Sequence, residues 1–229
     1  MMNKLLTYQL LEDQMVKYKD LKKIKVKECG EPLITLSTIN NCYQNELNDM
    51  ESILRKKVWF RQTVVKKLIL AQKLLKKIRP SWQFLVTYGY RSYEVQKKYF
   101  NQILKKLRLE YQNKNLLYEA IHRQIAIPEV AGHPTGGAVD LTIIDDDDNN
   151  KQINMGTKIY DFNNKDIYTF TPFIPLKAKK NRLLLRLVML KVGFAPFDGE
   201  WWHFSFGDKE WVFYYKKSVA IYNKVIKLP

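Results

Sequence analysis

Two histidines and two carboxylates of this chain occur in short motifs whose residue types suit metal-assisted hydrolysis. His133 opens the segment HPTGGAVD, which ends at Asp140, and His203 closes the segment EWWH, which begins at Glu200. Two imidazoles and one carboxylate are the ligand set of a catalytic zinc, which keeps a fourth position for water. Zinc lowers the pKa of that water to roughly 7, so hydroxide is available at neutral pH. The two motifs therefore predict a site for one zinc ion per chain.

A second carboxylate that does not bind the metal is then needed to take a proton and return it to the leaving amine. Glu200 is the candidate, because it lies close to His203 in the chain without sharing its strand face. The glycine pair at 136–137 allows a sharp turn after His133, and strand alternation then points Asp140 away from its apolar neighbours. Either histidine alone would be structural about as often as metal-binding. The occurrence of both motifs favours the metal site.

The elements that must position these residues follow from hydrophobic periodicity. Apolar residues at spacings of four and three predict a helix that ends before Pro80, and strict alternation predicts the strand that carries Asp140. We expect helices at 46–79, near 95–107, at 116–125 and at 181–192, and strands at 84–88, 138–144, 204–206 and 211–215. Helices come first and strands cluster later without a βαβ rhythm. The sequence therefore predicts an α+β fold with a mainly antiparallel sheet flanked by helices.

Length and composition fit one globular unit. The chain has 229 residues, of which 46% are hydrophobic, enough to bury a substantial core. We expect residues 1–45 to be an N-terminal extension packed on a catalytic domain at residues 46–229. We expect no signal peptide and no transmembrane segment, and the two cysteines cannot make a disulfide framework. These features predict a cytoplasmic protein with reduced thiols.

Charge alone would permit other functions. The net charge of +16 allows binding to nucleic acid or to an anionic surface. The lysine-rich helix faces lack a reader motif or an aromatic stacking platform, so nucleic acid is not the expected partner. The acidic run 145–148 is not an EF-hand, because Asn150 and Gly156 stand where glycine and glutamate are required. His122, in AIHRQ, is expected to be structural or exposed.

The segments HPTGGAVDLT, EWWHF and YGYRS together resemble the zinc D-alanyl-D-alanine dipeptidases of the VanX type. These enzymes belong with lysostaphin-like peptidases, D-Ala-D-Ala carboxypeptidases and the hedgehog signalling domain, and the resemblance implies the fold of that group. It covers residues 55 to 206, including the segment NRLLLRLVMLKVGF before the second motif. The family motifs S-x-H-x-x-G-x-A-x-D and E-x-W-H are matched by His133, Gly136, Ala138, Asp140, Glu200, Trp202 and His203.

Carried over position by position, the resemblance implies that His133, Asp140 and His203 bind zinc. Glu200 then corresponds to the general base and acid. Arg91, in YGYR, matches the arginine that polarises the scissile carbonyl and stabilises the oxyanion. A permanently charged guanidinium beside the metal suits an anionic tetrahedral intermediate.

Residues for substrate binding match the family less well. MGTKIYD resembles the family segment M-G-S/T-x-F-D with one extra residue, which makes Asp161 the candidate for holding the substrate ammonium. Trp202 is the second candidate for substrate binding. Ala131 replaces the serine of the first motif, Ser92 replaces a usual proline and should loosen its turn, and Leu36 replaces a substrate-binding tyrosine. Reaction class is therefore better determined than substrate.

We expect zinc-dependent hydrolysis of D-alanyl-D-alanine, or of a closely related small peptide, with Glu200 as the base. One alternative is a D,D- or L,D-carboxypeptidase that acts on longer cell-wall peptides. Another is a non-catalytic zinc or binding module like the hedgehog domain, against which the presence of both Glu200 and Arg91 counts. Oligomeric state does not follow from the sequence.

Overall fold

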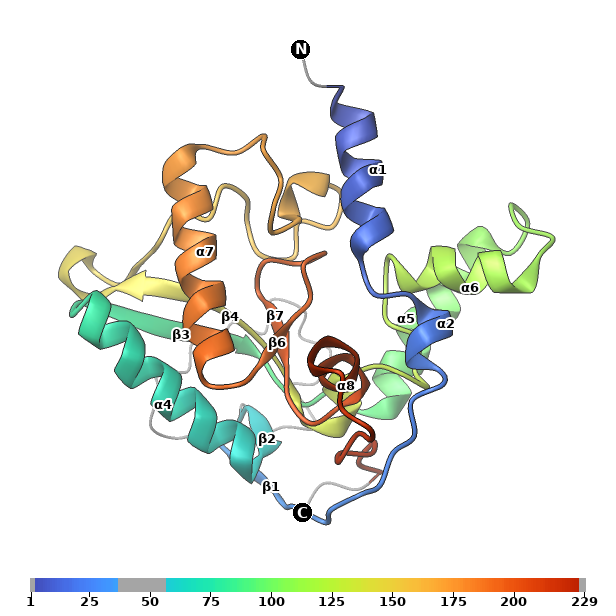
Figure 1. Ribbon diagram of the computed structural model, residues 1–229, viewed down its shortest axis with the longest axis horizontal. Helices are drawn as coiled ribbons and strands as arrows, with labels where there is room; N and C mark the ends of the chain where they lie inside the picture. The colour runs from blue at the N-terminus through green and yellow to red at the C-terminus, as the bar shows by residue number, and fades with distance from the viewer. Residues whose placement is uncertain (1–2, 37–56, 227–229) are drawn as a thin grey trace.

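An antiparallel sheet forms the centre of the computed structural model, which describes residues 3–36 and 57–226 (Figure 1). The helices are α1 (Lys4–Gln14), α2 (Tyr18–Leu21), α4 (Gln62–Ile78), α5 (Tyr93–Leu107), α6 (Lys114–His122), α7 (Leu176–Lys191) and α8 (Lys209–Tyr215). Short 3-10 helices are η1 (His133–Thr135), η2 (Asp146–Asp148) and η3 (Lys165–Ile167). The strands are β1 (Leu33–Thr35), β2 (Trp59–Arg61), β3 (Trp82–Tyr88), β4 (Ala138–Asp145), β5 (Lys151–Gln152), β6 (Ala195–Pro196) and β7 (His203–Ser205).

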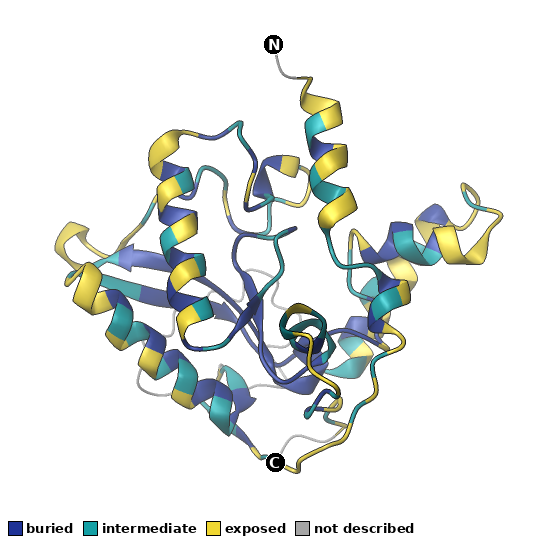
Figure 2. Cartoon of the chain, in the orientation of Figure 1, coloured by how far each residue is buried: buried dark blue, intermediate teal, exposed yellow. Residues whose placement is uncertain are grey.

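The strand pairs bear out the predicted fold class. The main sheet has the order β3-β4-β7-β6, with β5 added to the far end of β4, and β1 pairs with β2 separately. Every pair of these strands is antiparallel. The α+β prediction with a mainly antiparallel sheet is therefore confirmed. The strand β4 is buried along nearly its whole length because it has neighbours on both sides (Figure 2).

One face of this sheet is apolar and is covered by α4 and α7, which lie in front of the strands in Figure 1. Val139, Leu141 and Ile143 of β4 belong to the same buried cluster as residues of both helices. Because strand side chains alternate, the residues between them face the other side. That second face of β4 carries Asp140 and Thr142, both buried. The sheet thus separates a hydrocarbon core from a polar layer.

The helix α4 shows why the chain folds onto this face. Of the predicted apolar stripe, Val64, Leu68, Ala71 and Leu75 are fully buried, whereas Ile78 at the end of the helix is exposed. Lys66 and Lys73 stay exposed, and Lys67 is half-buried and donates to the Val192 carbonyl. The predicted start at residue 46 is wrong in its described part, since β2 occupies 59–61 and the helix begins at Gln62. Residues 46–56 lie outside the described part of the chain.

Three other predicted elements differ from the structure. The segment 211–215, predicted as a strand, lies in α8, because the Asp208 side chain accepts the Trp211 N–H and caps a helix there. The helix predicted at 181–192 starts earlier, at Leu176, directly after Pro175. The polar loop after β4 contains the short strand β5, which pairs back on β4.

The N-terminal residues contact the rest of the protein through polar groups and a second apolar cluster. Tyr8 of α1 donates its hydroxyl to Asp166, and Glu12 accepts from Lys165 and Tyr168. Tyr18 and Leu21 of α2 join a buried cluster with residues of α5 and α6. The expected boundary between residues 45 and 46 lies outside the described residues. Within the described chain, no helix is both long and apolar enough to cross a membrane.

A buried arginine ties the N-terminal segment, the turn at η1 and the C-terminal segment together. Arg61 is only 5% exposed, and its guanidinium donates to the Thr135 carbonyl, to the Glu28 carboxylate and to the Asn223 carbonyl. Its backbone N–H donates to the carbonyl of Gly136 at 3.0 Å. Gly136 has φ +73°, and an added Cβ would lie 2.3 Å from Leu33 Cδ2. The hydrogen bonds from Arg61 to Thr135 and Gly136 fix the turn that begins with His133.

We expect Arg61→Ala to destabilise the protein by about 2–4 kcal/mol, since each buried acceptor left without its donor typically costs about 1–3 kcal/mol. The substitution leaves the Thr135 and Asn223 carbonyls without their partner. Denaturant unfolding followed by circular dichroism measures the loss. Lys66→Ala is the matched control, because Lys66 is an exposed cation on α4 and should change stability by less than about 0.5 kcal/mol. Equal stability of the two variants would contradict the role given to Arg61.

Candidate metal centre

The register of β4 and β7 places two of the predicted ligands opposite one another. Asp140 of β4 is the direct partner of His203 of β7 in the antiparallel ladder. Paired residues share a face of the sheet, so their side chains meet. His203 Nδ1 lies 2.8 Å from Asp140 Oδ1, and both residues are buried.

His133 approaches the same carboxylate from η1. Its Nδ1 lies 2.7 Å from the Gly89 carbonyl oxygen, and this bond orients the ring. A carbonyl can only accept, so Nδ1 carries the hydrogen and Nε2 presents its lone pair. Nε2 lies 3.4 Å from Asp140 Oδ2. Gly89 has no room for a side chain, since an added Cβ would lie 2.7 Å from the ring of Phe60.

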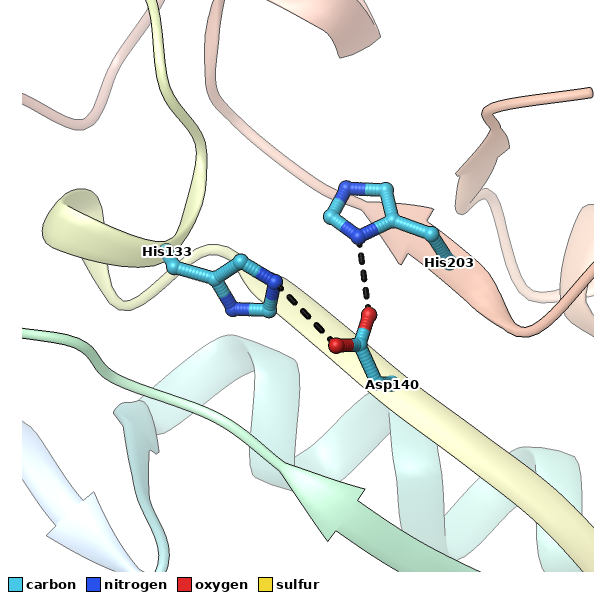
Figure 3. A group of neighbouring side chains, drawn as sticks. All are labelled: His133, Asp140 and His203. Atoms are coloured by element: carbon cyan, nitrogen blue, oxygen red, sulfur yellow. Dashed lines mark hydrogen bonds and ion pairs between the residues drawn. The ribbon is translucent and has the colours of Figure 1, made fainter. Parts of the chain in front are cut away.

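The three side chains offer converging ligand atoms, all within 4.8 Å of one another (Figure 3). Ligand atoms around a tetrahedral zinc lie roughly 3.4 Å apart for bonds of about 2.1 Å. Burial opposes a charge on Asp140, but its interactions with His133 and His203 outweigh burial and hold its pKa well below the ordinary value. A buried ionised carboxylate between two imidazoles has the chemistry of a divalent metal site. The assignment of these residues as ligands remains a prediction that this geometry supports.

Glu200 lies in the loop that joins β6 to β7. The turn is closed by hydrogen bonds from the Glu200 N–H to the Phe197 carbonyl and from the His203 N–H to the Glu200 carbonyl, both 3.0 Å. Glu200 lines the same pocket as His133, Asp140 and His203. Burial raises the pKa of its carboxyl to about 7. A carboxyl with a pKa near neutrality suits a group that takes and returns a proton.

Arg91 also lines this pocket, and its side chain is held on several sides. Its Nε donates to the Tyr88 hydroxyl at 3.1 Å, and Nη1 donates to Gln96 Oε1 at 3.0 Å. The guanidinium lies 4.5 Å from the ring centre of Tyr88 and 5.3 Å from that of Tyr99. Arg91 is therefore a fixed positive charge beside the cluster.

The two predicted substrate-binding residues, Asp161 and Trp202, do not line this pocket. Asp161 is not among the described residues that line the pocket, and its carboxylate accepts from the side chain of Asn164 at 3.3 Å. Trp202 is fully buried in the main core. Its ring lies behind Tyr160 and Phe162, with ring centres 5.6 and 5.9 Å away, and these two residues line the pocket instead.

The structure locates the three residues that depart from the family motifs. Ser92 does not loosen its turn as expected, because its φ of −61° matches that of proline and its side chain accepts the Val95 N–H at the start of α5. Ala131 is buried and lines the pocket. Leu36 is buried in the main core.

Three further residues reach this pocket without having been predicted from the sequence. Glu210, on α8, has Oε2 3.4 Å from His203 Nε2. Tyr160 has a left-handed backbone, with φ +62°, and its hydroxyl lies 3.3 Å from Asp140 Oδ2 and 2.8 Å from Thr87 Oγ1. His122 is buried and lines the pocket as well. The extra residue in MGTKIYD is the sequence feature that could have drawn attention to Tyr160. Glu210 directly precedes the segment 211–215, and the prediction of a strand there gave no reason to place Glu210 in the site.

Comparisons with known proteins show the family of the chain. The family model Peptidase_M15, described as D-ala-D-ala dipeptidase, matches residues 50–224. A D-alanyl-D-alanine dipeptidase of Synechocystis sp. is 28% identical over an alignment of 232 positions. The alignment covers 88% of this chain and 92% of that protein. An Escherichia coli D-alanyl-D-alanine dipeptidase is 35% identical over 75 residues, covering 33% of this chain and 37% of that protein. The solved LdcB LD-carboxypeptidase has a TM-score of 0.47 at 18% identity, with 80% of this chain and 71% of that chain covered.

The family match identifies the class of the protein as a metallopeptidase. The family match extends over most of the chain, and the chain belongs to the D-Ala-D-Ala dipeptidase family Peptidase_M15. The resemblance inferred from the motifs is thereby confirmed.

We expect His203→Ala to lose its metal during purification. Loss of one of three ligands should cost more than the roughly 10–100-fold in affinity that loss of an outer hydrogen-bond partner costs. Metal analysis of the purified protein measures the occupancy. His122→Asn is the matched control, because it removes a buried histidine that lies outside the cluster of ligand atoms. Full zinc occupancy in His203→Ala would refute the assignment.

Proposed function

We propose that this protein is a zinc-dependent dipeptidase that hydrolyses D-alanyl-D-alanine or a closely related small peptide. The observation that best supports it is the buried His133–Asp140–His203 cluster, with Glu200 and Arg91 lining the same pocket. The D-alanyl-D-alanine dipeptidase activity given for the relatives agrees with this substrate. A purely structural metal site would close its coordination with a fourth protein ligand. Only three candidate ligands converge among the described residues.

The donor set suits zinc. Two imidazole nitrogens and one carboxylate oxygen match the ligands of catalytic zinc, whereas calcium and magnesium prefer oxygen alone. Bound by His133, Asp140 and His203, zinc would lower the pKa of a coordinated water to roughly 7 and polarise the scissile carbonyl.

The side chains around the cluster then divide the remaining work. The Glu200 carboxylate takes a proton from the attacking water and delivers it to the nitrogen of the leaving amine as the peptide bond breaks. The Arg91 guanidinium stabilises the negative charge that develops on the carbonyl oxygen. Its contacts to Tyr88 and Gln96 hold it in place before the substrate binds, so little reorganisation is needed during the reaction.

One observation favours a second candidate, a carboxypeptidase that acts on longer peptides. A dipeptidase must recognise a free ammonium close to the scissile bond, and the mapped carboxylate for this task is Asp161. Asp161 accepts from Asn164, while the aromatic residues on either side of it line the pocket. An acylated or longer substrate presents no ammonium at that position and would not need this carboxylate.

We expect Glu200→Gln to keep its zinc and to lose about 10²–10⁴-fold in turnover, the usual contribution of a positioned acid–base group. Metal analysis and steady-state kinetics on D-Ala-D-Ala measure the two properties. Glu94→Gln, which removes an exposed carboxylate on α5, is the matched control. Loss of zinc from Glu200→Gln would identify Glu200 as a ligand rather than a base.

Activity of the wild type should fall as the pH is lowered through the pKa of Glu200. Burial raises this pKa to about 7, and the protonated carboxyl cannot accept a proton. A neighbouring divalent cation favours the charged form, so the acid limb of kcat/KM should lie at or below pH 7. The limb should be absent from the residual activity of Glu200→Gln. Activity that rises as the solution is made more acidic would contradict the assigned base.

Asp161→Ala tests which substrate the pocket accepts. If Asp161 binds the ammonium, kcat/KM should fall steeply for D-Ala-D-Ala and much less for N-acetyl-D-Ala-D-Ala, because charge-assisted hydrogen bonds are the strong kind. Asn163→Ala, at an exposed neighbour, is the control. Equal losses on both substrates would make Asp161 structural. A wild type that prefers acylated or longer peptides would favour the carboxypeptidase.

A further inference from the structure

Glu210 is a buried carboxylate whose position the proposed reaction does not explain. Its side chain is 11% exposed, and its Oε2 lies 3.4 Å from His203 Nε2. Among the described residues, its ion pair is with His203 and not with a lysine or arginine. Burying a carboxylate is costly unless it is paired. The interaction with His203 is therefore the one that accounts for its burial.

The two nitrogens of His203 face opposite groups. Nδ1 points to Asp140 Oδ1 and to the centre of the cluster, whereas Nε2 points away from it (Figure 3). Only one nitrogen of a neutral imidazole carries a hydrogen, and the other has the lone pair that binds a metal. When a metal replaces the hydrogen that Nδ1 shares with Asp140, a carboxylate beside Nε2 keeps the remaining hydrogen on Nε2 and leaves the lone pair on Nδ1 for the metal. The Gly89 carbonyl has the complementary effect on His133, since it accepts from Nδ1 and leaves Nε2 for the metal.

The helix α8 holds Glu210 at this place. Asp208 caps the helix by accepting the Trp211 N–H at 2.9 Å, and Trp211 Nε1 donates to the Gly193 carbonyl at 3.0 Å. Val212 is buried beneath the same turn. Gly132, which precedes His133, packs so closely on Asp208 that an added Cβ would lie 2.3 Å from its carboxylate. The capped turn thus lies against the segments that carry both histidines.

We propose that Glu210 is a positioning residue that selects the Nε2–H form of His203 and aims its Nδ1 at the metal. The proposal rests on the zinc site of the proposed function. It predicts an effect on metal affinity that is separate from proton transfer, because Glu210 acts through His203 and not on the substrate.

The test is zinc affinity, measured by competition with a chromogenic chelator. Glu210→Ala should bind zinc 10–100-fold more weakly than the wild type, the usual cost of losing an outer partner of a metal-binding histidine. Glu210→Gln keeps an oxygen that can accept from Nε2, so its affinity should fall between the two. At saturating zinc, kcat of both variants should return to within about tenfold of the wild type. Glu94→Gln, a surface carboxylate on α5, should bind zinc like the wild type.

A wild-type affinity in Glu210→Ala would overturn the proposal, as would a collapse of kcat with zinc affinity unchanged. If Glu210→Ala does not fold, Glu210→Gln and the wild type still decide. Long-range ¹H–¹⁵N NMR spectra of the zinc-loaded wild type report which nitrogen of His203 carries hydrogen, and an Nδ1–H form would contradict the proposal. Failure of the wild type itself to bind zinc would instead refute the proposed function, so the two failures are distinguishable.

Discussion

The pairing of β4 with β7 is the constraint on which the metal centre depends. Asp140 meets His203 only because these two residues are partners across the antiparallel ladder. Side chains alternate between the faces of a strand, so a shift of one residue in either strand would turn the ligand into the apolar core. The register is in turn fixed by Val139, Leu141 and Phe204, which pack on the opposite face with α4 and α7. Packing of hydrocarbon on one face therefore determines the chemistry on the other.

The part of the site that follows from sequence is the part carried by local motifs. His133, Asp140, Glu200 and His203 are close to turns or strand positions whose periodicity is readable, and the structure gathers all four around one pocket. The apolar stripe of α4 was predictable for the same reason. Glu210 was not, because WVFYY has the β-branched and aromatic residues of a strand, and the Asp208 cap decides for a helix. The cap is a local signal that the strand prediction overlooked, whereas the contact of Glu210 with His203 is tertiary and is absent from a local pattern.

The segment MGTKIYDF supplies part of the pocket wall. Tyr160, in MGTKIYD, has a left-handed backbone, and its hydroxyl contacts Thr87 and Asp140. Such a backbone is costly for a non-glycine residue and persists only where surrounding contacts impose it. Here the contacts are the buried hydroxyl interactions and the packing of the ring against Trp202. Tyr160 and Phe162 consequently form the wall of the pocket, and Asp161 between them contacts Asn164.

The charges of the pocket explain why its protonation and metal binding are coupled. Asp140, Glu200 and Glu210 are three carboxylates, and Arg91 supplies one positive charge, so the ionised groups with neutral imidazoles sum to −3 + 1 = −2. Without a cation, burial raises the pKa of Glu200 to about 7. Burial would lower the pKa of His203, yet its bonds to Asp140 and Glu210 raise it well above the ordinary value. Protons thus balance the excess negative charge, and a divalent cation can replace them, since metal ligands must be deprotonated to bind. The same carboxylates that make this pocket costly to bury therefore favour a doubly charged ion at its centre, which would neutralise their charge in place of those protons.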